Sequence, residues 1–157
     1  VSDAGRALVD AGEDFEVERH NPYKDYTDLA LALDSVRRRW LGAEVITTCA
    51  TGGRPDMALS VLGLLANYKD APVWIAEDEI TARILHEGES WTIVGAEGKT
   101  FSIIAIAPNT EVSEHGLDWE LDHSPLGLLA DTGLSNVVRA TATIQVHAGT
   151  TIAYLYQ

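Results

Sequence analysis

The stretch Pro22-Tyr23-Lys24-Asp25-Tyr26-Thr27-Asp28 stands directly before a helical pattern, and the predicted fold of the first half starts from it. Apolar side chains follow at spacings of four, three and four, on one face of an α-helix: Leu29, Leu33, Val36 and Trp40. Thr27 is a favourable N-cap residue, because its hydroxyl can accept a hydrogen bond from a free N–H of the first turn. The sequence therefore predicts a helix from residue 28 to about residue 40.

The same stretch combines a cation, two carboxylates and a hydroxyl within residues 24–28. The positive end of a helix attracts anions, and its free N–H groups together with Lys24 suit phosphate oxygens. Asp25 and Asp28 can hold the magnesium ion that accompanies a nucleotide. The alternative is ordinary capping, in which Asp and Thr stabilise a helix start by about 1 kcal/mol. The stretch alone leaves both interpretations open.

Composition limits the classes of partner. The chain has 157 residues, 46% of them hydrophobic, and a net charge of −13. Such a chain can form a packed core, as one domain or two small ones. Its acidic field repels nucleic acid and anionic membranes, so we expect neither, whereas a magnesium ion would permit an anionic substrate. No apolar run has the length of a membrane span and no signal peptide is visible, which predicts a cytoplasmic protein.

The first half of the chain alternates between strand and helix patterns. We expect these elements, in order: a short helix over 2–12, a strand over 15–18, the helix to 40, a strand over 44–50, a well-buried helix to about 68 and a strand over 73–76. Cys49 is expected to be a buried strand thiol rather than a nucleophile. Residues 51–56 form a strand-to-helix turn, here called the glycine turn, whose two glycines allow a ligand to approach the backbone. This order predicts a parallel sheet, with ligands at the carboxyl ends of the strands.

The pattern changes near Glu77. From there to Gln157 no long helical pattern is present, and short β-rich runs are separated by glycines. Such a sequence is typical of an antiparallel β-sandwich. We therefore predict an α/β then all-β chain: a partial parallel α/β nucleotide-binding domain over 1–77, followed by a β-sandwich over 78–157.

Four motifs resemble those of thiamine pyrophosphokinases. The family carries Lys-Asp-x-Thr-Asp, matched by residues 24–28, and Gly-Gly-Arg-x-Asp, matched by residues 52–56. It also carries Gly-Leu-x-Trp/Tyr-x-Leu, matched by residues 116–121, and a Ser-Asn pair, matched by residues 135–136. The four occur in order across nearly the whole chain. The resemblance implies an α/β nucleotide domain, a β-sandwich, and a homodimer with the thiamine site at its interface.

The resemblance also implies a reaction and a set of roles. The hydroxyethyl oxygen of thiamine attacks the β-phosphorus of ATP, which makes the enzyme an ATP:thiamine diphosphotransferase that yields thiamine diphosphate and AMP. By resemblance, Asp28 and Asp25 hold magnesium, and Asp28 also acts on the attacking hydroxyl. The expected phosphate and nucleotide contacts are Lys24, Thr27, Gly53, Arg54 and Asp56. The expected thiamine contacts are Trp119, Ser135 and Asn136.

Departures from the family pattern keep other hypotheses open. The family usually has His, Asn and an acidic residue where this chain has Met57, Val61 and Val137. Its Asp-Gly-Gly and Gly-Asp-Phe-Asp-Ser motifs should precede Ser2-Asp3, and the sequence opens without them and without methionine. It can therefore be a piece of a longer protein, and we expect the isolated chain to be inactive. The competing hypotheses are a non-catalytic module that binds or senses thiamine or its diphosphate, and a dimerisation domain with a vestigial site.

Structural roles are the alternatives for several of these residues. Trp119 can belong to a strand core, and Ser135-Asn136 can form a simple turn after Gly133. The other three tryptophans are expected in the core: Trp40, Trp74 and Trp91. The five histidines lack metal-ligand spacing, so we do not expect zinc.

Overall fold

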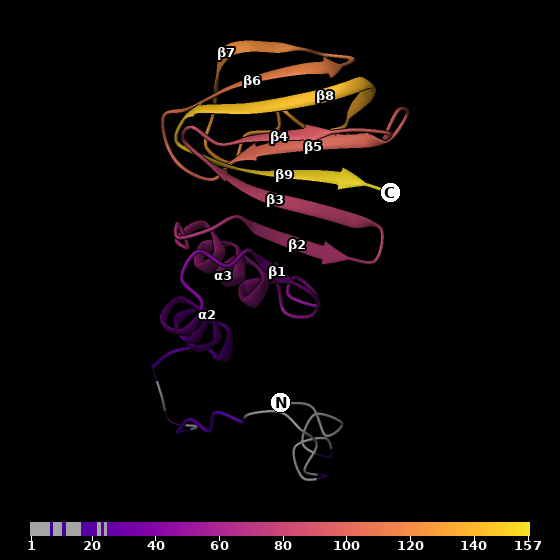
Figure 1. Ribbon diagram of the computed structural model, residues 1–157. Coiled ribbons are helices and arrows are strands. Elements are labelled where there is room, and N and C mark those ends of the chain that lie inside the picture. The colour runs from indigo at the N-terminus through magenta and orange to yellow at the C-terminus, as the bar shows by residue number, and fades with distance from the viewer. Residues whose placement is uncertain (1–6, 8–10, 12–16, 22, 24) are drawn as a thin grey trace.

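The computed structural model describes residues 7, 11, 17–21, 23 and 25–157. Within them the chain is mostly β, with one mixed sheet and two long helices (Figure 1). The helix expected over 2–12 and the strand expected over 15–18 lie largely outside the described residues, and Lys24 lies outside them entirely. No described helix is long and apolar enough to cross a membrane.

Helix α2, Asp28–Arg39, begins where the sequence predicts. The Thr27 hydroxyl accepts a hydrogen bond from the Ala30 amide at 3.2 Å, so the expected cap is present. Leu33 is buried on the face toward the sheet. The expectation for Trp40 is wrong: it is 59% exposed, because it ends the helix as its C-cap and lies beyond the packed face.

Strand β1, Val45–Thr47, pairs in parallel with β2, Val73–Glu77, and helix α3, Pro55–Ala66, connects them. Pro55 occupies the first turn of α3, as expected. Strand β1 is shorter than predicted, because the chain leaves the sheet after Thr47 to enter the glycine turn. Cys49 is therefore exposed, with a φ of +53°, and the prediction of a buried strand thiol is wrong.

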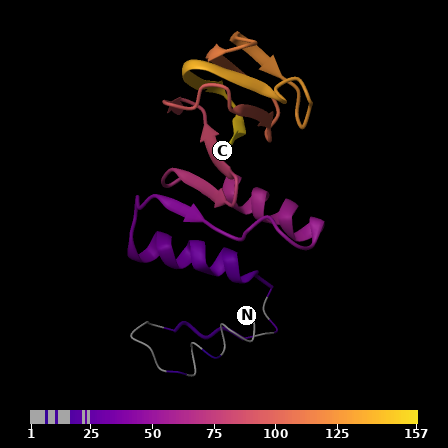
Figure 2. The same ribbon diagram turned by 90° about the vertical axis from the view of Figure 1, so that its right-hand side faces the viewer.

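Helix α3 is also less buried than its apolar sequence predicts. Only Leu65 is fully buried, whereas Met57 and Leu59 are 44% and 66% exposed. A helix that packs on a sheet buries one stripe of side chains, and here Val61 and Leu62 are partly buried beside Leu65. Both helices begin at the edge of the sheet where β1 ends, so residues 25–28 and the glycine turn lie on the same side (Figure 2).

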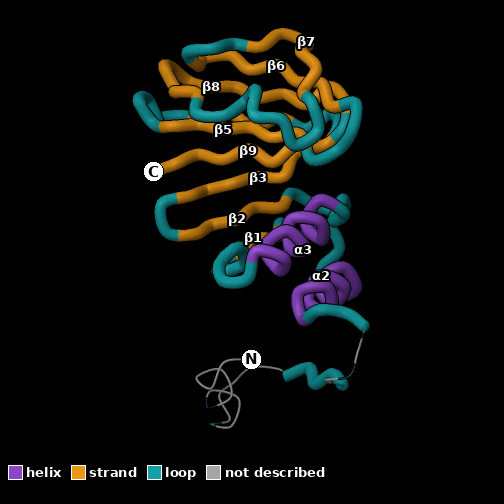
Figure 3. Tube along the Cα trace, turned by 180° about the vertical axis from the view of Figure 1, so that it is seen from behind, coloured by secondary structure: helices purple, strands orange, loops and turns teal. Residues whose placement is uncertain are grey.

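The remaining strands are β3 (Ile80–His86), β4 (Ser90–Ile93), β5 (Thr100–Ala105), β6 (Thr110–Leu117), β7 (Leu121–Leu126), β8 (Asn136–Ala148) and β9 (Thr150–Tyr156). The strand order in the sheet is β1-β2-β3-β9-β5-β8-β6-β7, with β4 beside β8. Every pair other than the parallel β1–β2 pair is antiparallel. Strand β8 pairs with β5 at its start and with β4 and β6 further along. The helices lie at the β1–β2 end of the molecule, and no helix follows Ala66 in the fully described range 67–157 (Figure 3).

Two hydrophobic cores share strands β3 and β9. Side chains alternate along a strand, so Ile84 and Ile152 face the core beneath the helices. Their neighbours Leu85 and Ala153 face the second core, between β5 and the β4-β8-β6 strands. Strand β2 turns directly into β3, and the sheet is continuous across residues 77–80. The division into domains at residue 77 stays a prediction.

Candidate functional site

The phosphate-side residues lie at the start of α2. Asp25 is exposed, and Asp28 occupies the first turn of the helix. The Thr27 hydroxyl is half-buried and accepts from the helix backbone. The oxygen of this hydroxyl is used by the cap. Thr27 can therefore bind a phosphate only by donating the hydrogen of its hydroxyl.

The glycine turn places a charged pair at the start of α3. Gly53 has a φ of +84°, a conformation that glycine adopts without strain. Nε of Arg54 donates to Oδ1 of Asp56 at 3.1 Å, and a second guanidinium nitrogen donates to the other carboxylate oxygen. The hydrogen bond from Arg54 holds the pKa of Asp56 below its ordinary value. The two predicted nucleotide residues therefore engage one another, and both are exposed.

Glu77 fixes the loop that leads into the glycine turn, and the sequence prediction missed it. Its carboxylate, at the end of β2, accepts from the Ala50 amide at 2.5 Å and from the Thr51 amide at 2.8 Å. The Thr51 hydroxyl donates to the other oxygen, and this bond is the main cause that lowers the pKa of Glu77. An acidic residue at the carboxyl end of the neighbouring parallel strand was the available signal.

The carboxylates of residues 25–28 fit a magnesium ion only in part. Among the described residues, no group of three or more His, Cys, Asp or Glu side chains could hold a metal. Magnesium in nucleotide sites is commonly held by one or two carboxylates, with waters and substrate phosphates completing the shell. Asp25 and Asp28 are compatible with that arrangement, in which the substrate supplies further oxygens.

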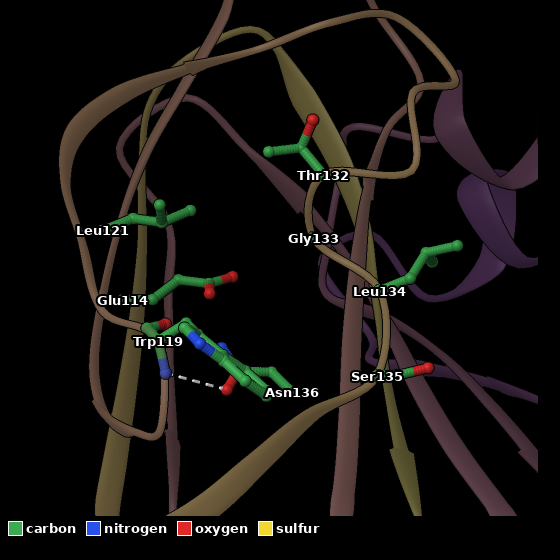
Figure 4. Close-up of a pocket in the computed structure, with 8 residues that line it drawn as sticks. All are labelled: Glu114, Trp119, Leu121, Thr132, Gly133, Leu134, Ser135 and Asn136. Atoms are coloured by element: carbon green, nitrogen blue, oxygen red, sulfur yellow. Dashed lines mark hydrogen bonds between the residues drawn. The ribbon is translucent and has the colours of Figure 1, made fainter.

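The three predicted thiamine residues lie together around one pocket of about 300 Å³ (Figure 4). The pocket is lined by Glu114, Trp119, Leu121, Thr132, Gly133, Leu134, Ser135 and Asn136. These residues come from β6, from the turn between β6 and β7, from the first residue of β7, and from the segment that leads into β8 together with the first residue of β8.

Asn136 positions the Trp119 segment. The Asn136 side chain is buried, its Oδ1 accepts from the Trp119 amide at 3.1 Å, and its Nδ2 donates to the Trp119 carbonyl at 2.7 Å. Trp119 is 65% exposed, so it is not a core residue of a strand and its ring is available at the pocket. Ser135 has a φ of +60°, its amide donates to the Ser102 hydroxyl, and its own hydroxyl points away from Glu114 (Figure 4).

Glu114 is the second residue that the sequence prediction missed. It is only 1% exposed, yet its carboxyl lies in the pocket wall (Figure 4). Burial raises the pKa of Glu114 to about 7, and a hydrogen bond from Asn136 opposes that shift. Glu114 lies two residues after the buried Val112, so strand periodicity was the signal that could have placed it inward.

The phosphate-side residues and the pocket are separated within one chain. Residues 25–28 and 51–56 adjoin β1, at one end of the strand order, and the pocket adjoins β6 and β7 at the other. In Figure 1, β6 and β7 lie at the top of the molecule, and β1 lies well below them beside the two helices. A single chain therefore does not bring the two groups of residues together.

Part of the chain matches a known protein family. Residues 84–151, which include every pocket residue, match the family described as "Thiamin pyrophosphokinase, vitamin B1 binding domain". Thiamine pyrophosphokinase 1 of Arabidopsis thaliana is 26% identical over 125 residues, which cover 74% of this chain and 47% of that protein. The chain thus spans about half the length of the curated relative that it matches.

Solved structures share the fold. The thiamine pyrophosphokinase of Bacillus subtilis aligns with 100% of this chain and 74% of its own, with a TM-score of 0.78 and 19% identity. A thiamin pyrophosphokinase family protein of Enterococcus faecalis aligns with 100% of this chain and 75% of its own, with a TM-score of 0.81 and 18% identity. The sequence match, the curated relative and these structures all support a member of the thiamine pyrophosphokinase family, which confirms the resemblance carried by the four motifs.

Proposed function

We propose that this chain acts in a thiamine pyrophosphokinase, which transfers the pyrophosphoryl group of ATP to thiamine. The hydroxyethyl oxygen of thiamine forms a bond to the β-phosphorus as the bond from that phosphorus to the α–β bridging oxygen breaks. AMP leaves with the bridging oxygen, and the hydroxyl proton passes to a base. Such a reaction depends mainly on positioning and on neutralising phosphate charge.

The observation that carries the proposal is the pocket inside the matched residues 84–151. It offers the exposed face of Trp119 together with the buried carboxyl of Glu114. A cationic thiazolium ring is attracted by an aromatic face and by the acidic field of a chain with a net charge of −13. The same charge argues against nucleic-acid and anionic-membrane partners. We propose that the protein acts in the cytoplasm.

The phosphate side of the proposal uses the starts of both helices. A magnesium ion would neutralise the phosphate charge, held by Asp25 and Asp28, and Asp28 would also accept the hydroxyl proton. Lys24 and Thr27 would contact phosphate oxygens. The glycine turn would take the nucleotide side, with Glu77 holding its entry in place.

We further propose that the functional unit is a homodimer. The two groups of site residues lie apart in one chain, and a second copy can supply the missing half of each site. Large apolar side chains are exposed at and near the pocket: Trp119, Leu128, Leu129 and Leu134. Their exposed fractions run from 46% to 66%, and an apolar rim of this kind is typical of a surface that another chain covers.

A thiamine-binding or thiamine-sensing module without catalysis is the second candidate function. The observation that favours it lies on α3, where Met57 replaces the family's usual histidine and is 44% exposed beside the glycine turn. A thioether offers at most a weak acceptor to a phosphate group. In this case the pocket would be retained and the phosphate side would be lost.

Calorimetry followed by an assay for AMP separates the two functions. The full-length protein is titrated with thiamine, and ATP and magnesium are then added to the same sample. Thiamine binding with AMP released in proportion to thiamine supports the kinase. Binding without AMP favours the sensing module, and the absence of thiamine binding would contradict both.

A further inference from the structure

The Glu114 carboxyl is the least satisfied polar group of the pocket. Its Oε1 is buried and has no hydrogen-bond partner among the described residues. A buried polar atom without a partner is costly, and it is often found where a ligand supplies the missing bond. Figure 4 shows the carboxyl directed into the space between Leu121 and Gly133. The group is thus placed to meet a molecule bound in the pocket.

The other polar groups around Glu114 are engaged. Both polar atoms of the Asn136 amide hold the Trp119 main chain, and the hydrogen bond from Asn136 to the Glu114 carboxyl still leaves Oε1 without a partner. The strands on either side place Leu121 and Ile144 opposite Glu114. The titratable and charged groups on its own strand and on the elements around it are paired elsewhere or exposed. The pairs are Glu111 with His123, His115 with Glu120, Asp118 with Arg139, and His147 with Ser113. Asp122 and Asp131 are exposed. The carboxyl therefore faces the ligand space without a charged partner from the protein.

We propose that the Glu114 carboxyl recognises one edge of the aminopyrimidine half of the ligand. On this edge an amino group stands beside an unprotonated ring nitrogen. This inference rests on the proposed function, because it takes thiamine as the ligand. A neutral carboxyl offers an acceptor and a donor side by side: its C=O accepts from the amino group and its O–H donates to the ring nitrogen. The aminopyrimidine ring would then lie within reach of the exposed face of Trp119.

The protonation of Glu114 agrees with this pairing. Burial raises its pKa to about 7, so the carboxyl is mostly neutral in slightly acidic solution. Loss of the proton would set a carboxylate oxygen against the lone pair of the ring nitrogen, which is repulsive. Ligand binding should therefore favour the protonated carboxyl, and affinity should fall as pH rises through about 7.

A different role gives the opposite dependence on pH. If the Glu114 carboxylate instead contacted the cationic thiazolium ring, binding would favour the ionised form of Glu114. Affinity would then rise with pH. The aminopyrimidine half of thiamine, used alone as its hydroxymethyl derivative, carries no thiazolium. Its binding isolates the edge contact from the charge contact.

The test measures thiamine by calorimetry and the aminopyrimidine fragment by NMR titration, from about pH 6 to about pH 8, on either side of the pKa of about 7. The variants are Glu114→Gln, Glu114→Leu and, as a control that makes the same Glu-to-Gln exchange elsewhere on the same strand, Glu111→Gln. Thermal unfolding and near-UV circular dichroism confirm that each variant is folded. The amide of Gln also offers a donor beside an acceptor, so Glu114→Gln keeps the edge contact without titrating.

We expect the wild type and Glu111→Gln to bind both ligands less tightly as pH rises. Glu114→Gln should bind with no such dependence, and Glu114→Leu should lose about ten-fold or more for both ligands. Equal binding by Glu114→Leu and the control would overturn the inference and leave the proposed function standing. If Glu114→Leu lost affinity for thiamine but not for the aminopyrimidine fragment, the inference would be overturned in favour of a contact with the thiazolium ring. No thiamine binding by the wild type would overturn the proposed function and the inference together.

Discussion

The buried carboxyl of Glu114 should make the stability of this protein depend on pH in a defined direction. Its pKa is raised from an ordinary value of 4.5 to about 7 in the folded chain, because burial disfavours the ionised form. An acid whose folded pKa is raised contributes its full stability below the unfolded pKa. That contribution is lost as pH rises toward the folded pKa. The window for Glu114 therefore runs from about pH 4.5 to about pH 7.

The size of the effect follows from the two pKa values. A difference of about 2.5, at about 1.36 kcal/mol for each unit, corresponds to about 3 kcal/mol. The side chain is 1% exposed, so solvent screening reduces this figure little. Glu114→Gln removes the titration but keeps the shape of the side chain. Because pH 5 already lies inside this window, part of the contribution is lost there. Between pH 5 and pH 8 the wild type should lose about 2–3 kcal/mol of stability relative to Glu114→Gln.

Chemical denaturation of the wild type and Glu114→Gln at both pH values measures this difference directly. Glu120→Gln serves as the control, because the pKa of Glu120 is lowered, chiefly by a hydrogen bond from the Gly116 amide, and it is exposed. Its contribution is present above the unfolded pKa and is lost as pH falls, which is the opposite sign. A gap between wild type and Glu114→Gln that is the same at pH 5 and pH 8 would refute the assignment of a neutral buried carboxyl.

Four further predictions concern a turn, helix α3 and the phosphate side. Gly116→Ala places a Cβ 2.4 Å from the Thr141 carbonyl oxygen at a φ of +79°, so denaturation should show a loss of about 2–4 kcal/mol. The matched control is Gly63→Ala on α3, where the added Cβ meets nothing within 4 Å. This change should stabilise the folded protein by about 0.5–1 kcal/mol. A loss of stability would contradict the exposed position of Gly63 on α3. Glu77→Ala should raise the KM for ATP about five-fold or more and leave thiamine affinity unchanged, and equal weakening of both would argue against separate half-sites. Asp28→Ala in the full-length protein should abolish AMP release with an unchanged Tm, and undiminished turnover would remove Asp28 from the mechanism.

Elements with a strong periodic pattern could be predicted from the sequence. The cap at Thr27 and the start of α2 follow from local chemistry, since the hydroxyl and the apolar stripe lie in one short segment. The parallel β1–β2 pair and the absence of helix in 67–157 follow from apolar runs and glycine spacing. The family motifs also selected Trp119, Ser135 and Asn136, and these three residues lie around one pocket.

Features that depend on distant partners could not be predicted. Cys49 lies in a β-branched run, but the route into the glycine turn decides that it leaves the sheet. The apolar sequence of α3 does not show which stripe meets the sheet, so Met57 was assigned to the interior. Glu77 binds a loop 26 residues away, and Glu114 is buried by the segment that enters β8. Strand periodicity can place Glu114 inward, but local patterns do not show which distant segments these two carboxyls meet.

The position of β9 has a consequence for how the protein is made. Strand β9 comes last in the chain, but it lies between β3 and β5 and contributes to both cores. During synthesis the sheet must therefore keep a gap at its centre until residues 150–156 have left the ribosome. Until then β3 and β5 each expose an unpaired edge, which invites pairing with other nascent chains. A premature stop before residue 150 would leave two half-sheets that cannot close, so the whole sheet depends on a strand that is synthesised after all the other described strands.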